Sequence, residues 1–383
     1  MKAYLDNNAT TRMAPEVLDA MLPFMTERYG NPSSFHSFGS EVMEDIEKAR
    51  RSVAGLIGAS PEEIYFTSGG TESDNTAILG ATAINPLRPG LLTSSVEHPA
   101  VMRTAEKLKE RGLPVEFAEV HGNGTLDLDS CSALITGSTG LFSLMMANNE
   151  TGVMMPVAEV TELARQAGAL FHTDAVQAVG KVPVDVRSMG IDLLSLSAHK
   201  FHGPKGAGAL YVRKGIDLPP LMNGGRQERG MRPGTYNAAG IIGLGKAAEL
   251  AASHLADDDG RTERLLRRLE KSVLESCPNA RVAGEKAPRL PNTAVILFRG
   301  VESEAIMTLL DLEGICVSAG SACSSGESSP SHVLSAMGID PREAGTAIRF
   351  SLSRYTSERE VDYLLEVLPS MVDKLRKISP YAD

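Results

Sequence analysis

The chain has 383 residues, too many for one small hydrophobic core, so we expect a large domain and a smaller one. Apolar residues make up 42% and charged residues 22% of the chain, values that exclude disordered and fibrous proteins. The net charge of -10, with no run of Lys or Arg, argues against nucleic-acid binding and favours a small-molecule substrate.

The N-terminal residues and the cysteines indicate the cellular compartment. The first residues lack the basic head and apolar core of a signal peptide, and no apolar stretch reaches membrane-spanning length, so we expect no membrane association. The cysteines, Cys131, Cys277, Cys316 and Cys323, form no CxxC pair and no metal-ligand cluster. We therefore expect free thiols in a reducing cytoplasm and no metal site, with Cys131, Cys277 and Cys316 as small buried residues.

Residues 1–14 are predicted to be extended, with an Asn-rich turn at 6–11. Pro15 starts a helix, and apolar residues at every third or fourth position predict a second helix from Phe38 to Leu56. Short apolar runs then alternate with helical stretches, which indicates a mostly parallel sheet covered by helices. The runs are residues 64–66, 91–93, 115–117, 141–145, 169–171, 193–196 and 208–212.

A Gly- and Arg-rich loop at 219–234 is followed by a predicted helix from Ala238 to about His254. We place the change of domain after this helix. The large domain is expected to comprise residues 15–255, and the small domain residues 1–14 and 256–383.

Lys200 lies in a segment rich in His, Ser and Gly that follows the apolar run at 193–196. A lysine that attacks a carbonyl must lose its proton, although its reference pKa is ~10.4. Burial at a strand end and a nearby cationic group would lower that pKa. We therefore predict that Lys200 is a covalent attachment point; the alternative for a lone lysine is an exposed position in a glycine-rich turn.

Other polar groups also follow apolar runs, where a parallel sheet binds its ligands. Gly70 and Thr71 lie in a glycine turn that could hold a phosphate at a helix start, or the turn could be an ordinary capped helix. Asp174 could hold a ring nitrogen protonated, with Gln177 beside it, or it could cap a helix from Ala175.

Further candidates come from four other segments. His98 could stack on a flat ring, or it could only begin a helix before Pro99. Asn149 offers an amide donor, and Arg349 suits a substrate carboxylate. Cys323 has only Gly, Ser and Ala around it, so we expect it on an exposed loop as a nucleophile, with a chance surface cysteine as the alternative.

Together these residues resemble the cysteine desulfurases, in particular the NifS branch of the NifS/IscS family. The resemblance covers nearly the whole chain. It is carried by Gly-Gly-Thr-Glu-Ser-Asp-Asn at 69–75, Glu-His-Pro-Ala at 97–100, Ala-Asn-Asn-Glu-Thr-Gly at 147–152, His-Thr-Asp-Ala-Val-Gln at 172–177, Ser-Ala-His-Lys at 197–200, Arg-Pro-Gly-Thr at 232–235 and Gly-Ser-Ala-Cys at 320–323.

The resemblance implies an α/β protein of the aspartate-aminotransferase-like fold type I, with a mostly parallel seven-stranded sheet in the large domain and a smaller α+β domain. It implies a pyridoxal-phosphate enzyme, homodimeric and cytoplasmic, that converts L-cysteine to L-alanine and passes sulfur to an enzyme cysteine. The sulfur would then supply iron–sulfur cluster assembly, for example in nitrogen fixation, through a scaffold protein of the NifU/IscU type.

The resemblance also implies residue roles. Lys200 would attach the cofactor, Asp174 would pair with its ring nitrogen, His98 would stack on the ring, and Gln177 would meet the phenolic oxygen. The phosphate would be held by Gly70, Thr71, Ser197, Ala198 and His199, joined by Thr235 of the other subunit. Asn149 and Arg349 would bind substrate, and Cys323, in a loop at 318–330, would take the sulfur.

One departure concerns the segment after Gly326, which reads Glu-Ser-Ser where relatives have a Leu-Glu pair before the proline. Two rival interpretations remain. An aminotransferase or β-eliminating lyase would need Lys200 and Asp174 but not Cys323. The other is a sulfur-relay or assembly component without catalytic activity, and the presence of both Lys200 and Asp174 argues against it.

Overall fold

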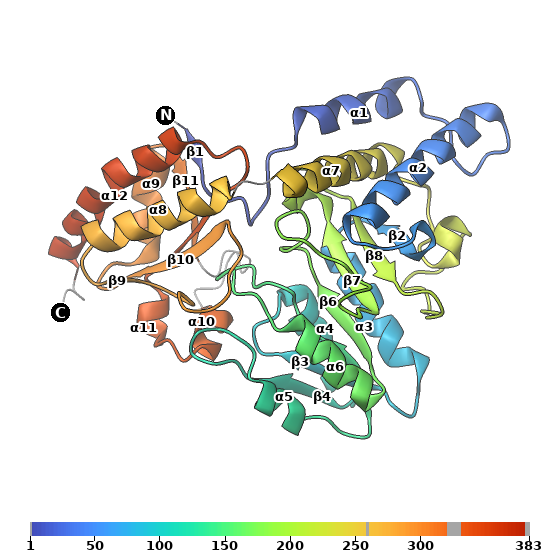
Figure 1. The fold of residues 1–383 in the computed structure, drawn as a ribbon, viewed down its shortest axis with the longest axis horizontal. Coiled ribbons are helices and arrows are strands. Elements are labelled where there is room, and N and C mark those ends of the chain that lie inside the picture. The colour runs from blue at the N-terminus through green and yellow to red at the C-terminus, as the bar shows by residue number, and fades with distance from the viewer. Residues whose placement is uncertain (1, 258–259, 320–330, 380–383) are drawn as a thin grey trace.

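A computed structural model describes residues 2–257, 260–319 and 331–379. Figure 1 shows two lobes, each built around its own sheet, with both chain ends in the same lobe. We call the part around the seven-stranded sheet the large lobe and the part around the four-stranded sheet the small lobe.

The large lobe contains a seven-stranded sheet of order β2-β8-β7-β6-β5-β3-β4. Strand β8 runs antiparallel to β2 and β7, and the other neighbouring strands run parallel. The predicted mostly parallel sheet is therefore confirmed. The strands are β2 Ile64–Thr67, β3 Gly90–Ser94, β4 Val115–Ala118, β5 Thr139–Ser143, β6 Leu170–Asp174, β7 Leu193–Ser197 and β8 Gly208–Val212.

Helices cover both faces of this sheet. Successive residues of a strand point to opposite faces, so neighbouring residues of one strand join different cores. Leu193 of β7 joins a core with α3 and α4, and Leu194 joins a larger core with α2 and α7. The helices are α1 Pro15–Thr26, α2 Ser37–Leu56, α3 Gly70–Ile84, α4 Pro99–Glu110, α5 Leu128–Ala133, α6 Val157–Ala167 and α7 Ala238–Asp257, with short turns η1 Pro61–Glu63, η2 Ala198–Lys200 and η3 Gln227–Gly230.

The predicted helix start at Pro15 and the helix between Phe38 and Leu56 are confirmed. In α2 the spacing of Val42, Ile46 and Val53 places all three side chains in the core, as the sequence pattern requires.

The small lobe packs helices on an antiparallel sheet of order β12-β13-β10-β9 and on the parallel pair β1-β11. Its core includes Leu266, Leu269, Phe298 and Phe350. The elements are β1 Ala3–Tyr4, α8 Arg261–Ser276, β9 Ala280–Val282, β10 Thr293–Phe298, α9 Ser303–Leu312, β11 Ile315–Cys316, β12 Ser318–Ala319, α10 His332–Ala336, α11 Pro341–Ala344, β13 Ala347–Ser351 and α12 Glu358–Ile378.

The N-terminal segment connects the two lobes. Strand β1 pairs with β11, and Asp6 forms a bridge with Ser351 of β13. Further along, the amide of Thr11 donates to the carbonyl of His199 at 2.9 Å, at the end of the large sheet. The Asn-rich turn between these contacts therefore lies where the lobes meet.

The cysteine predictions are confirmed for Cys131 and Cys277, which are buried, whereas Cys316 is half-buried. Cys316 pairs with Tyr4 of β1, which is also half-buried, whereas the neighbouring pair Ala3 and Ile315 is buried. Because successive residues of a strand point to opposite sides, Cys316 lies on the less covered side of β11. Within the described residues, no helix combines the length and apolarity needed to cross a membrane.

A buried ion pair holds the loop after β8 against α2. Both terminal nitrogens of Arg50 donate to Glu228, at 2.8 and 2.7 Å, and both side chains are buried. Removing one partner leaves a buried charge uncompensated. We expect Glu228→Gln to lower the free energy of unfolding by about 3 kcal/mol in urea denaturation.

The matched control is Glu110→Gln, because Glu110 pairs with Lys107 where both side chains are exposed. That substitution should change the free energy of unfolding by less than about 1 kcal/mol. Equal losses in the two variants would contradict the importance of the buried pair.

Candidate active site

A cavity of about 210 Å³ lies beyond the carboxyl ends of the parallel strands, and residues from both lobes line it. It gathers most of the residues that the sequence singled out. These are Gly70, Thr71, His98, Asn149, Asp174, Gln177, Ser197, His199, Lys200 and Arg349.

One end of the cavity is suited to an anion. Helix α3 begins at Gly70, so its first backbone N–H groups have no partner within the helix and attract negative charge. Gly69 before it has φ 153°, and a Cβ on Gly70 would come within 2.6 Å of Val176 Cγ2. Glycine is therefore required for this close approach. Ser197 brings a hydroxyl to the same cavity from the end of β7.

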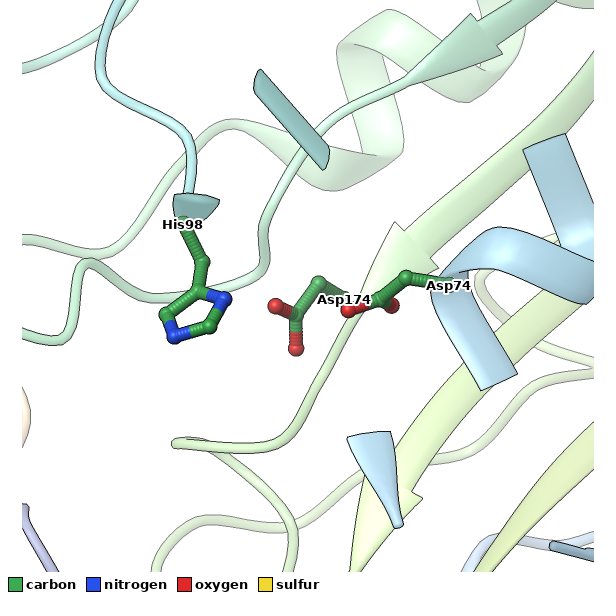
Figure 2. Close-up of side chains that lie close together, drawn as sticks. All are labelled: Asp74, His98 and Asp174. Carbon is green, nitrogen blue, oxygen red and sulfur yellow. The ribbon is translucent and has the colours of Figure 1, made fainter. Parts of the chain in front are cut away.

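His98 and Asp174 lie at the other end. Figure 2 shows the imidazole of His98 facing the carboxylate of Asp174, with Asp74 on the far side of Asp174 from His98. His98 Nδ1 accepts from the amide of Ala100 at 3.1 Å, so it caps α4 as well as lining the cavity. Burial lowers the pKa of His98, which favours the neutral ring.

Asp174 ends β6 and is buried, with Oδ1 accepting from the amide of Val176 at 2.9 Å. Burial raises its pKa, while the charges of His98 and Lys200 lower it. No α-helix begins at Ala175, because residues 175–182 form turns. The alternative of Asp174 as the cap of a helix is therefore wrong.

Asp74 is a second buried carboxylate that also lines the cavity. Single atoms of Asp74, His98 and Asp174 lie within 4.8 Å of one another. Burial and the charge of Asp174 raise the pKa of Asp74, and its Oδ1 has no hydrogen-bond partner. Asp74 belongs to the Gly-Gly-Thr-Glu-Ser-Asp-Asn segment at 69–75 but was not among the predicted site residues.

Lys200 lies just beyond β7, in η2, and points at the N-terminal segment. Its Nζ donates to the carbonyl of Asn8 and, at 3.0 Å, to the carbonyl of Ala9. It also lines the cavity with Asp174 and His98. The alternative of an exposed lysine in a glycine-rich turn is therefore wrong, because Lys200 is half-buried between the lobes.

Arg349 reaches the cavity from β13 of the small lobe. Its side chain is buried, and its terminal nitrogens donate to Asp6 Oδ1 at 2.8 Å and to the carbonyl of Asn149 at 3.1 Å. Its Nε is buried without a partner. A cation held this rigidly beside the cavity suits a carboxylate ligand.

Among the described residues, two that were predicted for the site, Ala198 and Thr235, do not line this cavity. Ala198 is buried, and its amide donates to the carbonyl of Ala207 at 3.0 Å. Thr235 is exposed and does not line the described cavity. Cys323 lies outside the described residues.

Asn8 and Lys181 are two further residues at the site that were not predicted from the sequence. Asn8 is buried and bonds to Asn149 of the large lobe and, through Thr293 Oγ1 at 2.9 Å, to the small lobe. Lys181 donates to Asn8 Oδ1 at 3.1 Å. Asn8 lies in a segment that the sequence marked as a turn, and no local pattern indicates that such a turn enters a site.

Comparison with known proteins gives consistent results. The family model described as "Aminotransferase class-V" matches residues 3–364. A cysteine desulfurase of Cereibacter sphaeroides is 55% identical, covering 99% of this chain and 98% of the relative. The cysteine desulfurase NifS of Azotobacter vinelandii is 51% identical, covering 99% of this chain and 94% of the relative. A solved NifS-like protein has a TM-score of 0.91 at 40% identity, covering 98% of this chain and all of that one.

The fold and the site define a pyridoxal-phosphate-dependent enzyme of fold type I. The chain belongs to the class-V aminotransferase family and, within it, to the cysteine desulfurases. The predicted fold class, cofactor and family are therefore confirmed.

The described residues fit this cofactor. The N–H groups at the start of α3 suit its phosphate, the glycine turn leaves room beside Val176, and the Asp174 carboxylate suits a protonated ring nitrogen. Asp74 Oδ1 instead lies 3.7 Å from the buried His172 Nε2. Lys200 is the amine that lines the same cavity from the end of β7.

Glu150 gives a pH-dependent test of the site's burial. Burial raises its pKa from 4.5 to about 7, against the hydrogen bond from Ser331 and the charge of Arg349, which lower it. Between pH 4.5 and about pH 7 the folded protein binds more protons at Glu150 than the unfolded chain does. The free energy of unfolding therefore falls as the pH rises through this range. Glu150→Gln should reduce this fall and stabilise the protein at pH 8 by up to about 3 kcal/mol, and the remaining fall comes from groups such as Glu97, whose pKa burial raises to about 8.

The measurement is the free energy of unfolding from pH 5 to pH 8 for the wild type and the variant. Glu110→Gln, at an exposed position, should keep the wild-type pH dependence. A Glu150→Gln protein that loses stability with rising pH as steeply as the wild type would contradict the raised pKa of Glu150.

Proposed function

We propose that this protein removes sulfur from L-cysteine, releasing L-alanine and leaving the sulfur on its own Cys323 as a persulfide. The observation that carries the proposal is that Lys200, Asp174 and Arg349 face one cavity in a chain that belongs to the cysteine desulfurases. Bound pyridoxal phosphate supplies the electron sink that acidifies the substrate Cα–H and labilises the Cβ–S bond.

The residues divide this work according to their position. Arg349 binds the substrate carboxylate and Asn149 helps to orient it, because both lie where the small lobe meets the cavity. Lys200 anchors the cofactor before substrate binds, and its amine afterwards relays the Cα proton. Asp174 holds the ring nitrogen protonated, and His98 covers the ring.

Gly70, Thr71, Ser197, Ala198 and His199 hold the phosphate end, and Gln177 serves the phenolic oxygen. All of these except Ala198 line the cavity, and Ala198 belongs to the same turn as His199. Its buried backbone therefore contributes by shaping that turn.

Cys323 is the proposed sulfur acceptor. Its thiolate attacks the substrate sulfur, a new S–S bond forms and the Cβ–S bond breaks. The electron pair of the broken bond stays with the carbon skeleton, which takes up protons and leaves as alanine. The thiolate form is the reactive one, so a nearby base would assist it.

We further propose a homodimer in which Thr235 contributes to the partner's phosphate site. The exposure of Thr235, away from its own chain's cavity, supports this. Large apolar side chains are also exposed on α1 and in the loop after it, among them Leu22, Met25 and Phe35. Such a patch is typical of a surface that a partner covers.

The remaining assignments concern the protein's context and organisation. We propose a cytoplasmic enzyme that passes sulfur to an iron–sulfur scaffold of the NifU/IscU type, with nitrogen fixation as its setting; the likeness to the NifS of Azotobacter vinelandii supports this. We also propose a large domain at 15–255 and a small domain at 1–14 and 256–383, which the separate apolar core of the small lobe supports.

The role of Cys323 is tested by Cys323→Ala. Without the acceptor thiol, alanine formation from cysteine should fall at least about 100-fold, while the visible absorption of the cofactor-loaded protein remains. The control is Cys316→Ala, at the half-buried cysteine of β11, which should retain activity. Undiminished alanine and sulfide formation by Cys323→Ala would favour a β-eliminating lyase.

The role of Thr235 is tested by subunit mixing. Lys200→Ala and Thr235→Glu should each be nearly inactive alone, the second because its carboxylate repels the phosphate. If each site joins Lys200 of one chain with Thr235 of the other, a mixed dimer contains one intact site out of two. About half of the dimers are mixed after random exchange of subunits, so the sample should recover about a quarter of wild-type activity. No recovery in verified mixed dimers would show that Thr235 serves its own chain or neither.

A further inference from the structure

The turn after β6 carries Lys181, a lysine that the proposed mechanism does not use. Gln177 and Lys181 are four residues apart in this turn, and the amide of Val182 donates to the carbonyl of Ala178 at 3.1 Å, as in one turn of helix. The two side chains therefore lie on the same side, and Lys181 Nζ donates to Gln177 Oε1 at 2.7 Å.

This contact determines which way the Gln177 amide faces. A protonated lysine can only donate hydrogen bonds, so it holds the amide oxygen and leaves the NH₂ group for the opposite side. There Nε2 donates to the carbonyl of Asn8 at 3.1 Å. The same carbonyl accepts from Lys200 Nζ, so the Gln177 NH₂ group lies beside the attachment amine, where Gln177 lines the cavity.

Lys181 also brings a positive charge without an acidic partner. Its hydrogen-bond partners among the described residues, Gln177 and the Asn8 side chain, are neutral amides. Burial and the charges of Lys200 and Arg349 lower its pKa. A half-buried lysine in this position is stabilised when a negatively charged atom comes close.

The other titratable groups that face Lys181 are imidazoles. Its charge contributes to lowering the pKa of His199 and of His202, both of which burial lowers to about 4. Both rings are therefore neutral near pH 7. The charged groups around Lys181 in the described chain are cationic, so an anion that offsets them would have to come from a ligand.

We infer that Lys181 is a positioning residue that fixes Gln177 with its NH₂ group toward the cavity, where it donates to the phenolic oxygen of the bound cofactor and stabilises negative charge there. The inference rests on the proposed placement of the cofactor. In this arrangement Gln177 contacts the cofactor. Lys181 contacts Gln177 and touches neither substrate nor cofactor.

The test is a pH titration of the visible absorption of the full-length, cofactor-loaded protein. Lys181→Met removes the hydrogen-bond donor to Gln177 and the positive charge of Lys181. Both disfavour protonation of the bound cofactor, so the midpoint of the pH titration should rise by about one pH unit. Lys181→Arg keeps a donor and a charge and should stay within about 0.3 pH unit of the wild type. Lys214→Met, at an exposed lysine beyond β8, is the control and should leave the midpoint unchanged.

A double variant separates positioning from simple charge. If Lys181 acts through Gln177, then Lys181→Met combined with Gln177→Leu should shift the midpoint by less than the sum of the single shifts. Additive shifts overturn the inference, and so does an unchanged midpoint with lowered thermal stability alone. If Lys181→Met does not fold, Lys181→Gln, which keeps a neutral donor, replaces it in the same cycle.

The outcomes also separate this inference from the proposed function. If the wild type gains no visible absorption when pyridoxal phosphate is added, the proposed placement of the cofactor fails. If the wild type and Lys181→Met both gain it with the same midpoint, only the role of Lys181 is overturned.

Discussion

The buried carboxylate of Asp174 is the constraint on which the site depends. A carboxylate removed from water is costly unless positive charge or hydrogen-bond donors compensate it. In the described chain, Asp174 receives one backbone donor, from Val176, and the favourable charge of Lys200. The second carboxylate, Asp74, adds to the cost. In the proposed placement of the cofactor, a protonated ring nitrogen would supply the compensation that these protein groups lack, and cofactor binding would then be coupled to stability.

Asn8 is the second element that holds the arrangement together. Its side chain contacts Asn149 and Lys181 in the large lobe and Thr293 in the small lobe, and its carbonyl accepts from Lys200 and Gln177. A single buried residue therefore links the sheet that is followed by Lys200 to the sheet that carries Arg349. The relative position of Lys200 and Arg349 in the cavity is therefore supported by the contacts of Asn8.

The sequence predicted the fold and the first layer of the site because both depend on local patterns. Apolar runs fix the strands, and parallel strands bring the residues after them, such as Lys200 and Asp174, to one edge. The second layer depends on contacts between distant segments. Asn8 meets Lys181 only after both lobes have folded, and neither residue has a local signature of that meeting. Thr235 and Cys323 remain predictions.

The described residues on either side of segment 320–330 contact different lobes. Before it, Ser318 of β12 pairs with Arg349 in the small sheet. After it, Ser331 donates to Glu150 and His332 Nε2 lies 2.9 Å from the carbonyl of Glu97, both in the large lobe. Any hinge motion between the lobes would therefore change the distance between Ser318 and Ser331, or break the hydrogen bonds that Ser331 and His332 make to the large lobe.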